Sequence, residues 1–213
     1  MAADYLPEFL AIVTAHALAV ASPGPDFALV LRQSLAHGRR TALWSSLGIG
    51  CGLSVHITYC LLGLGLFLKN SAPALATLQY LGAAYLFTVG LRALRTKPRV
   101  GDLAIAAGST APTGRAAWLN GFLVNLLNPK AALFFISLFP LAVSVTTPKL
   151  VQVGYGIWMT LATVAWFSFV SVVFTREEVR RRFLRHGHWS DRALGVVFIG
   201  FAVSLVLARL GKS

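Results

Sequence analysis

Charged residues are scarce in this chain of 213 residues. Asp, Glu, Lys and Arg make up 12% of it, roughly half the share in a typical soluble domain, and hydrophobic residues make up 56%. With a mean hydropathy of +0.70, a soluble fold would have too few charges to cover its surface. The same composition excludes a disordered chain, and two cysteines are too few for a disulfide scaffold. We therefore expect a protein that the lipid bilayer solvates.

Acidic residues are the scarcest charges, because 7 Asp and Glu stand against 19 Lys and Arg, for a net charge of +12. Such a surplus also occurs in nucleic-acid-binding proteins, where the basic residues gather on one soluble face. Here they lie between long apolar runs, which is typical of membrane topology signals. The pattern predicts contact with membrane lipid and no nucleic-acid partner.

Six apolar runs approach or exceed the length of about 20 residues that a transmembrane helix needs. They lie at 6–31, 42–68, 72–91, 116–145, 150–174 and 193–209. The chain starts without Lys or Arg, so we interpret the first run as a retained helix and not as a cleaved signal peptide. The predicted fold class is an all-α polytopic membrane protein with six transmembrane helices.

Most Lys and Arg residues lie in the connections that follow the first, third and fifth runs. The positive-inside rule places these connections in the cytoplasm, so both termini are predicted to lie outside. The basic segment at 176–192 fits this rule better than it fits a helix lying on the lipid surface.

The longest connection divides the chain into two halves of three runs each. We expect a first three-helix repeat at 1–95, a cytoplasmic linker at 96–115 and a second three-helix repeat at 116–213. Because three is odd, the second half enters the membrane in the opposite sense, which predicts inverted repeats of the kind found in secondary transporters. Two unrelated three-helix halves are the alternative.

Prolines interrupt the first run of each half, in ASPGPD at 21–26 and in NLLNPK at 125–130. A proline inside a helix leaves the carbonyl four residues earlier without a donor, so Pro129 frees the carbonyl of Asn125. At membrane depth such groups need protein, water or a polar ligand. Matched breaks of this kind indicate a transport site, whereas proline kinks that only shape packing are the alternative.

An ionisable residue follows each break. Asp26 suits the start of a helix, because a carboxylate there complements the helix dipole, so it is either a simple cap or a functional residue. Lys130 has the wrong sign for that position and is expected to have an anionic partner, either Asp26 or a substrate carboxylate. Asn125 and Asn128 are three residues apart and face the same region.

A lone membrane histidine is more often a hydrogen-bonding residue than a proton carrier, and this reading is favoured for both His16 and His56.

The PGPD motif followed by an apolar helix, and NGFLVNLLNPKAALFF at 120–135, resemble the lysine and homoserine/threonine exporter (LysE/RhtB) superfamily of bacterial amino-acid efflux proteins. The segments RQSLAHGRR (32–40) and LGAAYLFTVGLRALR (81–95) are similar to that family as well. The resemblance implies export of an amino acid or a derivative from the cytoplasm by proton antiport, through a homodimer of helical bundles in the bacterial inner (cytoplasmic) membrane. By position, the two signature segments of the family fall on the residues that this resemblance predicts to bind substrate, Pro23, Gly24, Pro25, Asp26, Asn125, Asn128, Pro129 and Lys130. Because a free amino acid is a zwitterion, we expect Asp26 to face its ammonium, while Lys130 and the N–H groups of the half-helix face its carboxylate. Asp26 is the first candidate for proton coupling and His56 is the second.

Other functional classes have less support. An enzyme is not expected, because no HExxH or GxSxG motif occurs and the five histidines form no ligand set, so we predict no catalytic residues, no metal site and no cofactor. An exporter of metal cations or small ions stays an alternative, although Lys130 would repel a cation. An accessory membrane subunit without transport activity is a further alternative.

Gly48 and Gly52 have the GxxxG spacing within the second apolar run. This spacing lets two helix backbones approach closely. It is compatible with a dimer face and equally with close packing inside one subunit.

Overall fold

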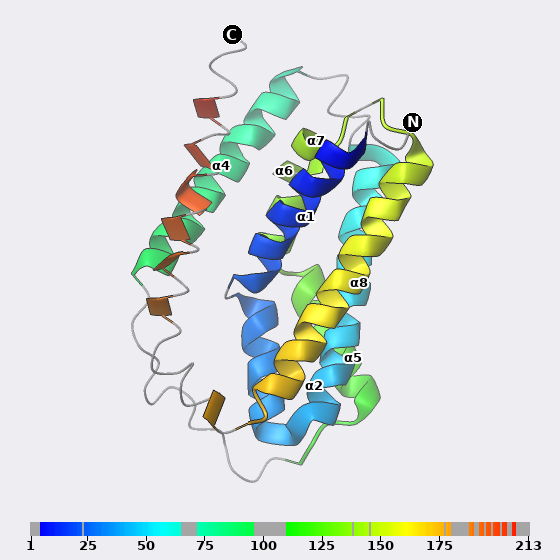
Figure 1. Ribbon diagram of the computed structural model, residues 1–213, viewed down its shortest axis with the longest axis vertical. Coiled ribbons are helices and arrows are strands. Elements are labelled where there is room, and N and C mark those ends of the chain that lie inside the picture. The colour runs from blue at the N-terminus through cyan, green and yellow to red at the C-terminus, as the bar shows by residue number, and fades with distance from the viewer. Residues whose placement is uncertain are drawn as a thin grey trace.

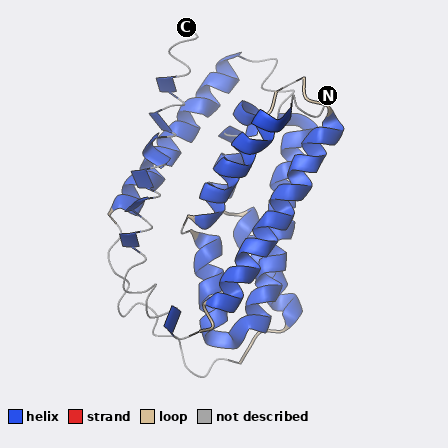
Figure 2. Cartoon of the chain, in the orientation of Figure 1, coloured by secondary structure: helices blue, strands red, loops and turns tan. Residues whose placement is uncertain are grey.

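A computed structural model describes residues 5–22, 24–64, 72–95, 110–137, 139–144 and 146–176, together with short helical stretches between 178 and 207. In these residues all regular secondary structure is helical, as Figure 2 shows, so the predicted all-α class is confirmed for the described part of the chain. Much of the predicted linker and of the predicted sixth span lies outside the described residues.

The helices form a bundle that is elongated along the helix axes (Figure 1). They are α1 (Leu6–Ala21), α2 (Pro25–Tyr59), the π-helix η2 (Cys60–Leu64), α4 (Ala72–Leu94), α5 (Gly114–Leu126), α6 (Pro129–Ser137), α7 (Phe139–Ala142) and α8 (Lys149–Val173). The first apolar run is broken between α1 and α2, and the fourth is broken between α5 and α6. These breaks fall in the two segments where the prolines predict them.

The chain reverses direction inside α2, at Gly38, whose φ of 80° and ψ of 175° are not helical. L-residues with a side chain rarely adopt this φ, so glycine is required at this position. In Figure 1, α2 descends from α1, turns at the bottom of the bundle and rises again. The first span therefore extends to a tight turn at Gly38, beyond the end predicted at residue 31.

Helices α2 and α5 approach closely along a line of glycines. A Cβ atom added to Gly52 would lie 2.8 Å from the carbonyl oxygen of Phe122, and one added to Gly48 would overlap the backbone of α5. Conversely, a Cβ atom on Gly121 would overlap the backbone of α2. The structure thus uses the GxxxG spacing for packing within one subunit.

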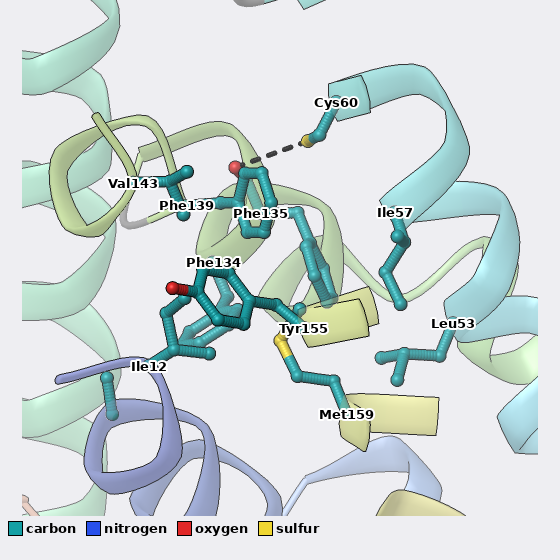
Figure 3. Close-up of a cluster of buried hydrophobic side chains, with 11 residues drawn as sticks. Ile12, Leu53, Ile57, Cys60, Phe134, Phe135, Phe139, Val143, Tyr155 and Met159 are labelled. Carbon is teal, nitrogen blue, oxygen red and sulfur yellow. Dashed lines mark hydrogen bonds between the residues drawn. The ribbon is translucent and has the colours of Figure 1, made fainter. Parts of the chain in front are cut away.

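A cluster of buried hydrophobic side chains joins α1, α2, α6 and α8 (Figure 3). Phe135 of α6 is 1% exposed, and its carbonyl oxygen accepts a hydrogen bond from the Cys60 thiol at 3.4 Å. Both cysteines are free. The cluster also includes Ile12, Leu53, Ile57, Phe134, Phe139, Val143, Tyr155 and Met159. It holds the short helix α6 against three longer helices, and α6 directly follows the second break.

Two of the described helices are long and apolar enough to cross a membrane, at Pro25–Leu62 and Lys149–Val173. The bent pair Gly114–Leu126 and Lys130–Ile136, with a bend of 54°, makes a third candidate, and α1 is a shorter apolar helix. The backbone of Gly90 in α4 lies close to that of Gly195, because a Cβ atom on Gly90 would be 2.8 Å from the carbonyl oxygen of Gly195. Six spans in two inverted repeats stay a prediction.

Candidate functional site

The two helix breaks lie against each other, although about a hundred residues separate them in the sequence. Asp26, in the first turn of α2, accepts hydrogen bonds on Oδ2 from Asn128 Nδ2 at 2.8 Å and from Asn125 Nδ2 at 3.0 Å. Asn125 lies at the end of α5 and Asn128 directly precedes α6. The structure therefore joins the acidic residue of the first break to both amides of the second.

Lys130, which follows the second break, in turn contacts the first break. Its Nζ donates a hydrogen bond to the carbonyl oxygen of Ser22 at 2.8 Å and lies 5.7 Å from the centroid of the Phe198 ring. A Cβ atom on Gly24 would lie 3.4 Å from Nζ, so glycine leaves room for the lysine at this point. Ser22 directly follows α1, where the negative end of the helix dipole favours a cation.

These partners bear on only one of the two anions expected for Lys130, because its Nζ bonds to the backbone carbonyl of Ser22 and a substrate carboxylate stays a prediction. Asp26 and Lys130 form no ion pair with each other in the described structure. The physical reason is that each charge lies at a helix end of suitable sign, Asp26 at the start of α2 and Lys130 at the end of α1. Below, the break cluster denotes Ser22, Asp26, Asn125, Asn128 and Lys130.

A cavity adjoins the break cluster, and all five residues of the cluster line it. The second carboxylate oxygen of Asp26, Oδ1, is buried and has no hydrogen-bond partner. The cavity has a volume of about 40 Å³, which is room for only a few waters. A whole amino acid would fit only if the cavity opened further.

A second polar pair lines the same cavity, His16 of α1 and Thr163 of α8. His16 Nε2 lies 2.9 Å from Thr163 Oγ1 and 3.2 Å from the carbonyl oxygen of Met159. Sequence reasoning gave His16 no role in the site and missed Thr163. No local motif marks Thr163, because only the packing of α8 against α1 brings it to the cavity.

His56 lies beside the second break and is not among the cavity-lining residues. Its Nε2 is 3.1 Å from the carbonyl oxygen of Asn125, the group that Pro129 frees, and its Nδ1 is 2.9 Å from the hydroxyl of Tyr59. The freed carbonyl predicted from the sequence thus meets a side-chain donor.

The remaining predicted residues divide into three groups. Gly24 lines the cavity with the break cluster. Pro25 and Pro129 begin α2 and α6, positions where a missing N–H costs no helical hydrogen bond, and Pro25 is not among the lining residues. Pro23 lies outside the described residues.

Comparison with known proteins places the chain in a family. The model of the LysE type translocator family matches residues 17–209, which include both helix breaks. The chain belongs to the LysE type translocator family. Membership confirms the resemblance that the two proline motifs indicate, and it shows a multi-pass membrane transporter, not an enzyme.

Several LysE relatives match over nearly their whole length. The threonine efflux protein of Salmonella typhi is 34% identical over 94% of this chain and 98% of its own. That of Escherichia coli K12 is 33% identical with the same coverage. An uncharacterized membrane protein of Pseudomonas aeruginosa is 30% identical over 96% of this chain and 97% of its own. No solved structure matches the chain.

Proposed function

We propose that this LysE family member exports threonine or a similar small neutral amino acid from the cytoplasm in exchange for protons. The observation on which this rests is the unpartnered Oδ1 of Asp26 in the same cavity as the ammonium of Lys130. An acceptor and a cation in one cavity complement the two charges of a zwitterion. The names of the threonine efflux relatives support the same substrate class.

In this proposal the substrate ammonium binds Asp26 Oδ1, and the substrate carboxylate binds Lys130 Nζ. The present partner of Nζ is the carbonyl oxygen of Ser22, at 2.8 Å. A carboxylate forms a stronger hydrogen bond with an ammonium than a neutral carbonyl does, so the substrate displaces this contact. The two amides of Asn125 and Asn128 meanwhile keep Oδ2 of Asp26 in place.

The substrate side chain would point toward His16 and Thr163. His16 precedes Ser22 by less than two turns of α1, which is a helical rise of about 9 Å. Phe134 and Phe167 also line the cavity and would contact a methyl group.

Proton exchange follows if a proton and the substrate ammonium compete for the carboxylate of Asp26. On the outer side, protonation of Asp26 releases the amino acid. On the cytoplasmic side, loss of that proton restores the acceptor for the next substrate. Asp26 and His56 are the two residues considered as proton carriers. Asp26 lines the cavity and His56 does not, so we assign the exchanged proton to Asp26.

Inverted repeats would give this site access to both sides of the membrane in turn. Each half contributes one broken helix, and the hydrogen bonds of the break cluster cross between the halves in both directions. This reciprocity supports a pair of repeats at 1–95 and 116–213. We place the protein in the bacterial cytoplasmic membrane, as a homodimer, with both termini outside.

A cation exporter has no comparable support. Among the described residues, no group of three or more His, Cys, Asp and Glu could hold a metal ion. The ammonium of Lys130 in the cavity would also repel a cation.

The first experiment measures efflux of labelled amino acids from preloaded proteoliposomes, with and without an imposed pH gradient. We expect gradient-dependent efflux of threonine from the wild type and its loss in Lys130→Ala. Lys149→Ala is the matched control, because Lys149 is an exposed lysine at the start of α8 and does not line the cavity. Folded wild-type protein that moves no amino acid, or a Lys130→Ala variant with normal efflux, would refute the proposal.

A further inference from the structure

We infer that His56 is a positioning residue, which holds the second helix break in the shape that presents Asn125 to Asp26, and that it does not transfer the exchanged proton. The inference rests on the proposed function only in taking the break cluster as the transport site. Its geometry stands on the contacts of His56 itself.

The hydrogen bond from His56 replaces one that proline removes. Pro129 has no N–H, so the carbonyl of Asn125 lacks its normal helical donor. The N–H of Asn128 donates to this oxygen at 2.9 Å, and His56 Nε2 approaches it at 3.1 Å. Because a carbonyl oxygen only accepts, Nε2 must be protonated to form this bond.

Both ring nitrogens of His56 are occupied. With the proton on Nε2, the neutral ring accepts at Nδ1 from the hydroxyl of Tyr59, 2.9 Å away. Among the described residues, the titratable groups that act on this ring are Tyr59, three residues further along α2, and Asp26, in the first turn of α2 before the turn at Gly38. A proton arriving at Nδ1 would have to reverse the Tyr59 hydroxyl, and His56 does not line the cavity from which the proton would come.

His56 also contacts the chain on the far side of the break. The ring of Phe135 in α6 lies parallel to the imidazole, with an interplanar angle of 3° and 5.9 Å between ring centroids. Phe135 belongs to the buried cluster of Figure 3 and lines the cavity. A single side chain of α2 therefore contacts the end of α5 by a hydrogen bond and α6 by stacking on Phe135.

Asn125 links His56 to the carboxylate of Asp26. Its backbone oxygen accepts from His56, while its side-chain Nδ2 donates to Asp26 Oδ2 at 3.0 Å. The close packing at Gly52, where an added Cβ would lie 3.0 Å from Asn125 Cβ, fixes α2 against the same residue. Loss of the His56 donor would let the Asn125 carbonyl turn away and would loosen the position of Asp26.

The test compares two variants in the efflux assay, His56→Gln and His56→Leu. Glutamine can place an N–H near the position of Nε2 but does not titrate, whereas leucine has similar bulk and no donor. We expect His56→Gln to keep the wild-type response to the pH gradient. We expect His56→Leu to raise the threonine concentration for half-maximal efflux by roughly tenfold, the effect of one lost hydrogen bond. A purely structural defect would lower the maximal rate and leave this concentration unchanged.

The control is His37→Gln, at a histidine of α2 that does not line the cavity, and it should behave as the wild type. A His56→Gln variant that exports threonine without responding to the pH gradient would overturn the inference. A folded His56→Leu variant with the wild-type half-saturation concentration would overturn it as well. If His56→Leu does not fold, the pH response of His56→Gln decides.

A wild type that exports no amino acid would refute the proposed function and leave the positional role to a different measurement. Hydrogen exchange of the backbone amides at 126–128 and 130 should then be faster in His56→Leu than in His56→Gln. Equal exchange in the two variants would overturn the inference.

Discussion

Replacing Asp26 by asparagine tests the two oxygens of its carboxylate separately, because they have different surroundings. Both amides, from Asn125 and Asn128, donate to the same atom, Oδ2, and Oδ1 is buried without a partner. An asparagine side chain has one oxygen and one NH₂ group. Its oxygen can accept both existing bonds, which leaves the NH₂ group at the position of Oδ1. The fold should survive, while the proposed acceptor for the substrate ammonium becomes a donor.

The size of the effect follows from the one bond that is lost. A hydrogen bond to a charged group contributes about 1.5–3 kcal/mol, so the half-saturation concentration for threonine should rise roughly 10- to 150-fold. The side chain of asparagine cannot take up the exchanged proton. Acceleration of efflux by an imposed pH gradient should therefore disappear in Asp26→Asn.

The assay is efflux from proteoliposomes over a range of threonine loads, with the melting temperature of each variant measured in parallel. Glu178→Gln is the matched control, because Glu178 is an exposed acid that does not line the cavity. If Asp26→Asn keeps both the wild-type half-saturation concentration and the wild-type pH response, Asp26 neither binds the ammonium nor exchanges the proton.

Three further predictions concern packing and selectivity. Gly48→Ala should lower the melting temperature, because its methyl group overlaps the backbone of Trp118 at a cost of about 1–3 kcal/mol in stability. Gly154→Ala is the control and should not lower it, since the space around Gly154 is open. Equal melting temperatures in the two variants would contradict the packing of α2 on α5. Thr163→Val should reduce the preference for threonine over valine roughly 2- to 10-fold in competition efflux, and an unchanged ratio would remove Thr163 from the side-chain end of the site. Gly38→Ala should cost about 1–3 kcal/mol in the free energy of unfolding, because a φ of 80° with a ψ of 175° suits glycine alone, without changing the half-saturation concentration. Unaltered stability would contradict the turn at this residue.

The helix breaks and their ionisable residues could be predicted from the sequence because the physics involved is local. Proline removes an N–H wherever the helix is, and a charge inside an apolar run is costly in any fold. Asp26 and Lys130 were therefore recognisable before any neighbour was known. The contact of Lys130 with the backbone carbonyl of Ser22 was not, because the end of α1 that meets Lys130 is set by how the two halves pack.

Composition and patterning by themselves determined the membrane environment, the helical class and the position of the two breaks, since each depends on properties of short segments. Only the tertiary structure decided which groups satisfy the freed backbone. His56 reaches the carbonyl of Asn125 because glycines bring α2 against α5, and Thr163 reaches the cavity because α8 packs on α1. These contacts join residues far apart in the sequence, and no local sequence pattern predicts which helices pack against each other.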